Sequence, residues 1–391
     1  MRHIKAMNKV KLISLVPVLW ALAACGINPV TGEREIQLVS QQSEIELGQK
    51  NYGSLQQSQG GSYEVDVSLS RYVNEVGQRV AAVADRKLPY EFVVVNNSVP
   101  NAWALPGGKI GINRGLLTEL RNEAELAAVL GHEVVHAAAR HSAKKMETGM
   151  AMNLGLIALG VSLRDKQEGQ ALMVAGSVGA ALLGQKYSRD AELESDRYGM
   201  EYMVKAGYDP QGAVTLQETF LRLSKGRNPN WLEGLFASHP PSQERVEANR
   251  RYAAQLTRPG LTLGEQRYRQ RIAALVKDIP AYNKYDEGRA ALAKKNYSRA
   301  MELANQAIAH EPREALFHAL KGDIYQAQNN HNTAVQHYQT AIQYNPNLFY
   351  YYLKRGMSYR QLGDRVKARA DLQRSYQLLP TKEAADALRA L

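Results

Sequence analysis

The 391-residue sequence contains a single cysteine, and none of its apolar runs is long enough to span a membrane comfortably. One cysteine excludes intramolecular disulfide bonds and zinc sites built from cysteine. The short apolar runs exclude a polytopic membrane protein, and 45% hydrophobic with 22% charged residues excludes wholesale disorder. Any bound metal must therefore be held by histidine or carboxylate side chains.

Residues 1–24 are predicted to be a lipoprotein signal peptide. Four basic residues precede a mainly apolar run over residues 12–24, which is the pattern of a secretory signal. The run ends in Leu22-Ala23-Ala24-Cys25-Gly26, which resembles the bacterial lipoprotein box. This predicts lipidation of Cys25; the alternative is a plain signal peptide with an incidental cysteine. Because the residue after Cys25 is glycine instead of aspartate, we expect an anchor in the outer membrane that faces the periplasm.

Charge is distributed unevenly along the chain. Residues 1–24 carry a net charge of +4, residues 25–249 carry −4, and residues 250–391 carry +11. The basic residues of the C-terminal part are scattered and do not cluster on one recognition element, so we expect no nucleic-acid partner. An acidic protein surface or anionic lipid head groups fit this part better.

The C-terminal 111 residues repeat with a period of 34. Glycine, alanine and proline recur in register, at Gly288, Gly322 and Gly356, at Ala300, Ala334 and Ala368, and at Pro312, Pro346 and Pro380. A 34-residue period with small residues at fixed offsets is typical of tetratricopeptide repeats, in which each repeat is a pair of antiparallel helices. We therefore predict a repeat domain over residues 281–391, with repeats at about 281–314, 315–348 and 349–382 and a capping helix.

The sequence between the signal and the repeats predicts a mainly helical domain with a small β-sheet, over residues 25–250, and a helical linker over 251–280. Apolar periodicity favours helices near residues 43–53, 69–84, 123–145 and 187–206. Two strands are expected, at 90–95 and after the turn Pro106-Gly107-Gly108. The second strand, residues 108–113, either pairs with an extended substrate at a sheet edge or is purely structural.

Two apolar runs, residues 150–163 and 171–184, are about 14 residues each and too short for comfortable transmembrane helices. They predict a buried helical hairpin. Contact with membrane or substrate, or a mobile cover over a site, are the alternatives that the sequence leaves open.

The sequence His132-Glu133-Val134-Val135-His136 falls within a predicted helix. Positions i and i+4 lie on one helical face, so both histidines can reach one metal ion, and Glu133 can act as a general base beside it. This HExxH pattern also occurs by chance, in which case the two histidines lie on the surface of an alanine-rich helix.

A second pattern supports the metal site. Glu192 and Asp196 are also spaced i, i+4, and a third ligand that is a carboxylate completes a catalytic zinc site with one open position. Glu194 is the rival ligand, but it lies about 200° around the helix from Glu192, so only one of the two can face the metal. We expect one Zn²⁺ per chain.

These motifs together resemble those of a family of membrane-linked zinc metallopeptidases, which includes the beta-barrel assembly-enhancing protease of Gram-negative bacteria and the mitochondrial Oma-type proteases. The resemblance extends over Asn28-Pro29-Val30-Thr31-Gly32, the continuation of HExxH to Arg140-His141, the helix with Glu192 and Asp196, a later His-Pro, and the repeats. Ser195 stands where the family usually has alanine, which touches no ligand.

The resemblance implies a gluzincin-type fold with His132, His136 and Glu192 as zinc ligands, Glu133 as general base, and Asp196 orienting a ligand histidine. It also implies that His239 lies over the zinc, where it either stabilises the transition state or occupies the open position in a latent form; the alternative is a turn histidine ahead of a helix. We expect His141 to be structural and to point away from His132 and His136.

The function implied is that of a periplasmic, lipid-anchored zinc endopeptidase, whose substrates are misassembled outer-membrane proteins and whose repeats recruit substrate or assembly machinery. The alternative is a chaperone or assembly adaptor that acts through its repeats, with a latent or silent protease domain. The sequence does not reveal the cleavage specificity or the oligomeric state.

Overall fold

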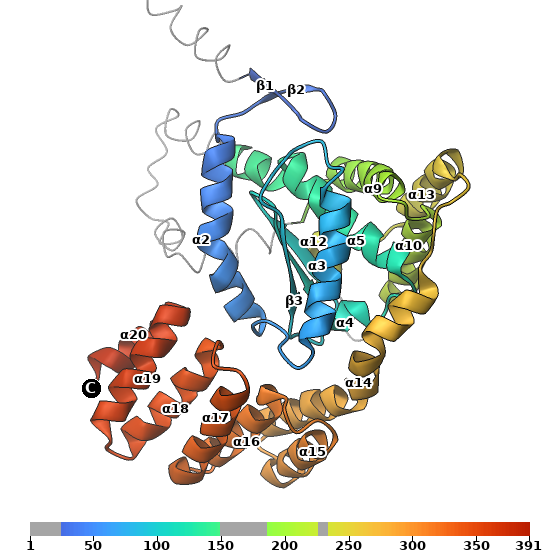
Figure 1. The fold of residues 1–391 in the computed structure, drawn as a ribbon. Coiled ribbons are helices and arrows are strands. Elements are labelled where there is room, and N and C mark those ends of the chain that lie inside the picture. The colour runs from blue at the N-terminus through green and yellow to red at the C-terminus, as the bar shows by residue number, and fades with distance from the viewer. Residues whose placement is uncertain (1–24, 149–185, 226–233) are drawn as a thin grey trace, which may run out of the picture.

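The computed structural model describes residues 25–148, 186–225 and 234–391 (Figure 1). The predicted signal peptide and the two apolar runs at 150–163 and 171–184 lie outside the described residues, so the predicted hairpin stays a prediction. No helix within the described ranges is both long and apolar enough to cross a membrane.

The described chain opens with a short hairpin of β1 (Cys25–Ile27) and β2 (Arg34–Ile36), which pair antiparallel. Two helices follow, α2 (Gln41–Gln59) and α3 (Val67–Ala81). Helix α2 begins where the Ser40 hydroxyl accepts from the amide of Ser43, and it ends at Gly60, whose φ of 117° is readily adopted only by glycine. The predicted helix at 43–53 is therefore longer than expected.

A three-stranded sheet lies beside α2 and α3 (Figure 1), and the later helix α5 (Glu123–Ala138) packs against both α3 and the sheet. Its order is β3 (Glu91–Val95), β5 (Lys109–Asn113), β4 (Ala102–Leu105), with β5 parallel to β3 and antiparallel to β4. The hypothesis that β5 offers a free edge to substrate is wrong, because both of its sides are paired. Its neighbour β4 is at the edge.

Helices α4 (Arg114–Leu117), α5 (Glu123–Ala138), α9 (Arg189–Lys205), α10 (Gln211–Ser224), α12 (Leu235–Ser238) and α13 (Gln243–Leu256) complete this part of the chain. Every residue of α5 is buried, as expected for a helix that is apolar nearly all round. The predicted helix over 123–145 is interrupted: α5 ends at Ala138, Arg140 has a φ of 63°, and a new helical segment begins at residue 141.

The two motif helices, α5 and α9, cross at a pair of glycines. A Cβ placed on Gly131 would lie 3.1 Å from the carbonyl oxygen of Gly199, and one on Gly199 would lie 3.1 Å from the amide nitrogen of His132. The absence of side chains here lets the backbones approach closely. This contact brings the residues around His132 next to those around Asp196.

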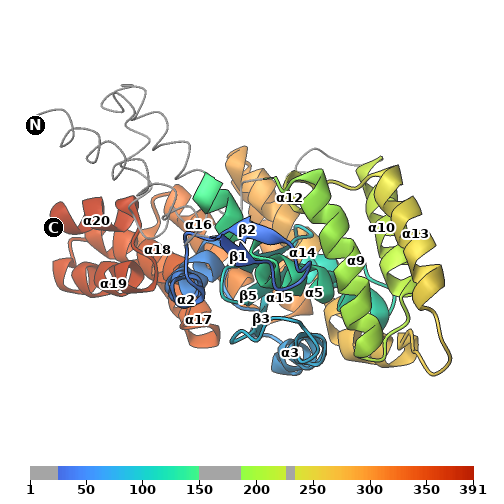
Figure 2. The ribbon, with the colours of Figure 1, turned by 90° about the horizontal axis from the view of Figure 1, so that it is seen from above.

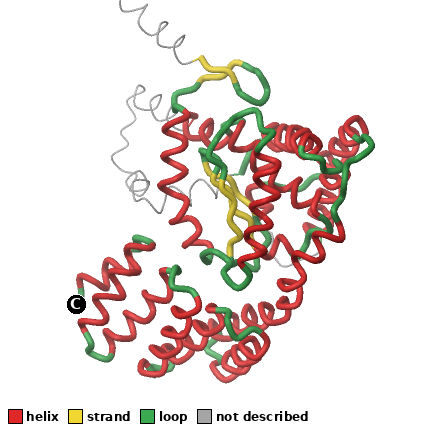
Figure 3. Tube along the Cα trace, in the orientation of Figure 1, coloured by secondary structure: helices red, strands yellow, loops and turns green. Residues whose placement is uncertain are grey.

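The remaining helices stack as antiparallel pairs (Figures 2 and 3). The pairs are α14 (Glu265–Ala293) with α15 (Tyr297–His310), α16 (Ala315–Ala327) with α17 (His331–Tyr344), and α18 (Phe349–Gln361) with α19 (Arg365–Leu378), followed by α20 (Lys382–Arg389). Helix α14 is continuous across Pro280, so the expected junction between linker and repeats falls inside one helix. The predicted fold class, mainly α with a small sheet and a C-terminal helical repeat, is confirmed.

Candidate metal centre

Helices α5 and α9 bring three candidate ligands together. His132 and His136 lie one turn apart on α5, with 3.0 Å between their Nε2 atoms. Glu192, in the first turn of α9, places Oε2 3.6 Å from His132 Nε2 and Oε1 3.4 Å from His136 Nε2. The histidine side chains and the carboxylate therefore converge on one point.

His239 approaches the same point from the end of α12. Its Nδ1 lies 2.9 Å from Glu192 Oε1 and 3.3 Å from His132 Nε2. One donor atom from each of the four residues fits within a span of 4.8 Å. His239 lies in the turn ahead of α13, and its side chain is part of the cluster.

The cluster fits a zinc ion. Zinc bonds of about 2.0–2.1 Å in tetrahedral geometry place ligand atoms roughly 3.3 Å apart, close to the spacing seen here. All four side chains are buried. Burial opposes a charge on His132, but the Glu192 and Asp196 carboxylates outweigh it and raise the pKa of His132 to about 10. Burial lowers the pKa of His136 well below its usual range, so this ring is neutral, as a metal ligand must be.

A carboxylate and an arginine support His132 from behind. Asp196 Oδ1 lies 2.9 Å from His132 Nδ1. The guanidinium of Arg245 contacts both oxygens of Asp196 at 2.7 Å and Glu192 Oε2 at 2.6 Å. Burial favours the neutral form of Asp196, but the ion pair with Arg245 prevails and lowers its pKa. Burial likewise opposes the charge on Glu192, but His239 and His132 prevail and lower its pKa well below the usual range. Both carboxylates are therefore ionised, as ligand support requires.

Arg245 was not assigned a role by the sequence. It lies on α13, and its contact with α9 depends on how two helices far apart in the sequence pack. Its position six residues after His239 is the only signal, and a lone arginine at the start of a helix is too common to be informative.

His141 points toward the ligand pair, contrary to the prediction from the sequence. Its Nδ1 lies 2.8 Å from His136 Nδ1, and its Nε2 lies 3.2 Å from Glu194 Oε1. The expectation that it points away from the ligand pair assumed one continuous helix. The left-handed backbone of Arg140 ends that periodicity and turns His141 back toward His136. Glu194, the rival ligand, contacts His141 and is not part of the metal cluster.

Tyr187 covers the other face of His136. The two rings stack with centroids 3.9 Å apart, and the tyrosine hydroxyl lies 3.0 Å from the Ser142 hydroxyl oxygen. Stacking and the hydrogen bond together restrict the rotation of the His136 ring. Apart from the position of Tyr187 just before α9, no pattern in the sequence marks this contact.

Glu133 lies beside the cluster, where a base would be needed. It is buried, its Oε1 lies 3.6 Å from His239 Nε2, and its Oε2 has no hydrogen-bond partner among the described residues. Burial raises the pKa of this carboxyl group. A cavity of about 30 Å³, lined in part by Val129, Met200 and Phe220, adjoins Glu133 and has room for a water molecule.

Known proteins resemble this chain in both of its parts. The profile of peptidase family M48 matches residues 68–253, and a tetratricopeptide-repeat profile matches residues 322–363. The beta-barrel assembly-enhancing protease of Escherichia coli (strain K12) is 27% identical over 309 residues, which are 71% of this chain. This chain spans 62% of the length of that relative.

A second relative is covered more fully. The metalloprotease YcaL of Escherichia coli (strain K12) is 31% identical over 184 residues, which are 44% of this chain and 68% of YcaL. Among solved structures, the Sgt2 repeat domain from Aspergillus fumigatus is 20% identical, with a TM-score of 0.27; the match covers 28% of this chain and 75% of that one. Together with the match to residues 68–253, the likeness to YcaL shows that the chain belongs to peptidase family M48.

Proposed function

We propose that this protein is a zinc endopeptidase. The observation that carries the proposal is the buried convergence of two histidines and a carboxylate on one point, with an unpartnered glutamate oxygen beside it. Membership of a peptidase family and the names of the relatives support the same function. In this proposal one Zn²⁺ is held by His132, His136 and Glu192, while Asp196 and Arg245 orient and balance the ligands.

When bound, zinc would polarise the carbonyl of a peptide bond and make a water molecule more acidic. Glu133 accepts a proton from the attacking water and delivers it to the amine that leaves. Burial suits Glu133 to this task, because a raised pKa brings the carboxyl group closer to neutral pH. The cavity beside it holds the water in reach.

His239 has two possible roles, and both follow from its position over the cluster. With Nδ1 near Glu192 and His132, it can complete the coordination and keep the enzyme latent. If it swings away, its ring can instead donate to the oxygen of the substrate carbonyl. The second role requires that His239, at the end of the four-residue helix α12, moves away from the cluster.

The location, substrates and partners that we propose are those suggested by the names of the most similar relatives reported above. We propose a periplasmic location with a lipid on Cys25, outer-membrane proteins as substrates, and assembly machinery as a partner of the repeats. The names of the relatives, beta-barrel assembly-enhancing protease, support this assignment. The proposal divides the chain into a signal at 1–24, a peptidase domain at 25–250, a linker at 251–280 and repeats at 281–391.

The test compares cleavage of fluorescently labelled casein by five versions of the full chain. Wild type and His239→Ala are expected to cleave, with His239→Ala faster if His239 keeps the enzyme latent. Glu133→Gln, in either background, is expected to lose cleavage by about 10²-fold or more while it still binds zinc, because it keeps the shape and loses the base. The exposed Glu218→Gln serves as a control and should match wild type.

Undiminished cleavage by Glu133→Gln would overturn the proposal. The alternative, an adaptor that acts through its repeats, predicts a different pattern: Glu133→Gln would support outer-membrane assembly in cells as well as wild type does. Loss of that support in the variant contradicts the adaptor hypothesis.

A further inference from the structure

Arg140 is held in an unusual conformation next to the metal cluster. Its φ of 63° lies in the left-handed region, which costs a residue other than glycine roughly 1–2 kcal/mol. Its side chain is nevertheless 2% exposed, deep in the structure. A strained backbone and a buried guanidinium persist only when the surroundings hold them in place.

The guanidinium of Arg140 makes four contacts that provide this hold. Nε donates to Glu44 Oε1 at 2.6 Å, Nη1 to Glu35 Oε1 at 3.2 Å, and Nη2 to Glu147 Oε1 at 2.9 Å. Nη2 also donates to the carbonyl oxygen of Val39 at 2.7 Å. Buried arginine is favourable when its fixed fork meets carboxylates in this way.

Two further cations balance the three carboxylates. Arg86 Nη1 contacts Glu44 Oε2 at 2.8 Å and the carbonyl oxygen of Ala137 at 3.3 Å, and Lys144 Nζ contacts Glu35 Oε2 at 2.6 Å. The six side chains form a neutral cluster that encloses the end of α5. Removal of Arg140 would leave the buried carboxylate of Glu147 without its cation and the cluster with a net negative charge, which is unfavourable.

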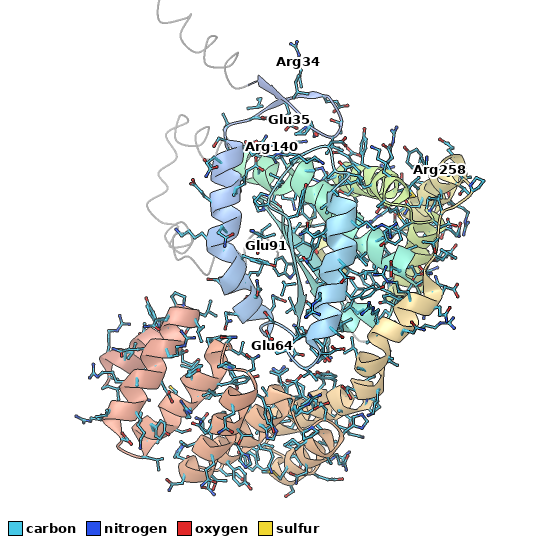
Figure 4. The ribbon with its side chains drawn as sticks, viewed as in Figure 1. Arg34, Glu35, Glu64, Glu91, Arg140 and Arg258 are labelled. Atoms are coloured by element: carbon cyan, nitrogen blue, oxygen red, sulfur yellow. The ribbon has the colours of Figure 1, made fainter. Side chains whose placement is uncertain are left out.

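The cluster also fixes the N-terminal arm, residues 25–40. Glu35 and the Val39 carbonyl contact Arg140, and the amides of Leu38 and Val39 donate to Glu147 Oε1 at 2.9 and 2.8 Å. Figure 4 shows Glu35 and Arg140 close together at the end of α2 nearest the hairpin. The arm therefore docks on the same side chain that ends the metal-binding helix.

His141, the next residue, carries this constraint to the metal site. If His136 binds a metal through Nε2, its Nδ1 must carry a hydrogen and donate it to His141 Nδ1, 2.8 Å away. His141 Nε2 then donates to Glu194 Oε1 at 3.2 Å. Only one arrangement of hydrogens satisfies this chain from Glu194 through His141 to His136, so the place of His141 sets the orientation of the His136 ring.

We propose that Arg140 is a positioning residue for the metal centre: with Glu35, Glu44 and Glu147 it fixes the backbone turn that aims His141 at His136, and it ties that turn to the docked N-terminal arm. The inference rests on the proposed metal site and does not depend on peptide cleavage. The arm begins at Cys25, so the residue predicted to carry the lipid and the residue that orients a metal ligand share one structural support.

The test is a double-mutant cycle on zinc affinity. The full chain is freed of metal and titrated with Zn²⁺ against a competing chelator, for wild type, Arg140→Ala, His141→Ala and the double variant. Each single variant is expected to weaken Zn²⁺ binding by about 10- to 100-fold, the usual effect of losing a residue that orients a ligand. The double variant should be no weaker than the worse single variant, because Arg140 acts through His141.

Three controls separate positioning from folding. Arg258→Ala removes an exposed arginine far from the cluster and should bind Zn²⁺ as wild type does (Figure 4). Arg140→Lys keeps the charge but not the fork, and should recover part of the affinity. If Arg140→Ala does not fold, Glu147→Gln, which removes one ion pair and keeps the shape, should weaken binding in the same direction.

A second measurement reports whether the N-terminal arm is still docked. Trypsin cleavage after the exposed Arg34 should be faster in Arg140→Ala than in Arg258→Ala, since the arm loses its contacts. Wild-type zinc affinity in folded Arg140→Ala, full additivity in the double variant, or equal cleavage after Arg34 would overturn the inference. A wild-type chain that binds no Zn²⁺ would instead contradict the proposed function.

Discussion

Asp323, a single residue in the repeats, has a carboxyl group whose burial is partly offset by hydrogen bonds. Its two oxygens accept hydrogen bonds from the hydroxyls of Tyr338 at 2.7 Å and Tyr350 at 2.9 Å. Burial still prevails over these bonds and raises the pKa of Asp323 to about 6. The side chain therefore titrates in a range where exposed aspartates are already ionised.

The sign of the effect on stability follows from this shift. Between the ordinary value of 3.8 and about 6, the folded chain binds more protons at Asp323 than the unfolded chain. The free energy of unfolding therefore falls as pH rises through this window. Between pH 4 and pH 7, we expect the free energy of unfolding of wild type to fall by about 1 to 3 kcal/mol more than that of Asp323→Asn. Urea unfolding at each pH measures both. Parallel curves for the two proteins would contradict the prediction.

The residues of the metal site differ in how far the sequence could predict them. His132 and His136 were found because helical spacing places them on one face, and Glu133 was found from its place next to His132. The choice of Glu192 over Glu194 came from the resemblance to the metallopeptidase family. The contact of Arg245 with Asp196 needs the packing of α13 on α9, which is not a local property. His141 was misplaced because no sequence signal marks the left-handed backbone of Arg140, where glycine or asparagine would be usual.

At the scale of elements, the crossing of α5 and α9 decides whether the ligands meet. The backbones touch at Gly131 and Gly199, close to His132 on one helix and Asp196 on the other. Any side chain at the crossing must push the helices apart. Such a shift would move Glu192 away from the histidines.

We expect Gly199→Val to cost about 1–3 kcal/mol of unfolding free energy from overpacking, and to weaken Zn²⁺ binding. Gly53→Val is the matched control, since Gly53 lies on an exposed part of α2 where an added Cβ meets nothing within 4 Å. Thermal unfolding and chelator competition measure the two effects. A Gly199→Val protein with the stability and zinc affinity of Gly53→Val would show that the close approach is dispensable.

The elements themselves were largely predictable. Period-3.6 patterns located α2, α3, α5 and α9, and the 34-residue period located the helices of the repeats. The turn at Pro106-Gly107-Gly108 located β5, but β4, on the other side of that turn, was not predicted. The order of the strands in the sheet could not be predicted. No local pattern indicates that β5 pairs in parallel with β3 and so lies between β3 and β4. The substrate-edge hypothesis failed for this reason.

At the scale of the whole molecule, a buried polar joint fastens the repeats to the peptidase part. The Arg114 guanidinium lies 3.3 Å from the ring centre of Tyr282 and donates to Asn96 Oδ1 at 2.6 Å. Glu314 Oε2 accepts from Tyr282 at 2.6 Å and from Asn96 at 3.0 Å. These residues are far apart in the sequence, so the 34-residue period predicted the repeats but could not predict their docking.

A cavity lies at the joint between the two parts, so the repeats cannot be removed without changing the surface of the peptidase part. A cavity of about 290 Å³ lies between Gln57, Asn97 and Arg114 of the peptidase part and Tyr285 and Phe349 of the repeats. The contacts at Glu314 and Tyr282 hold the two parts in one arrangement. Deletion of residues 281–391 would therefore expose buried surface of the peptidase part as well as remove the repeats.

Zinc-edge X-ray absorption of the full chain tests whether His132, His136 and Glu192 bind a zinc ion. We expect one zinc per chain with nitrogen and oxygen ligands at about 2.0–2.1 Å, imidazole scattering, and no sulfur. Glu192→Gln should lower the zinc content, whereas the Glu218→Gln control should not. A chain without zinc, or zinc in a shell of oxygens without imidazole, would show that these residues do not form the zinc site.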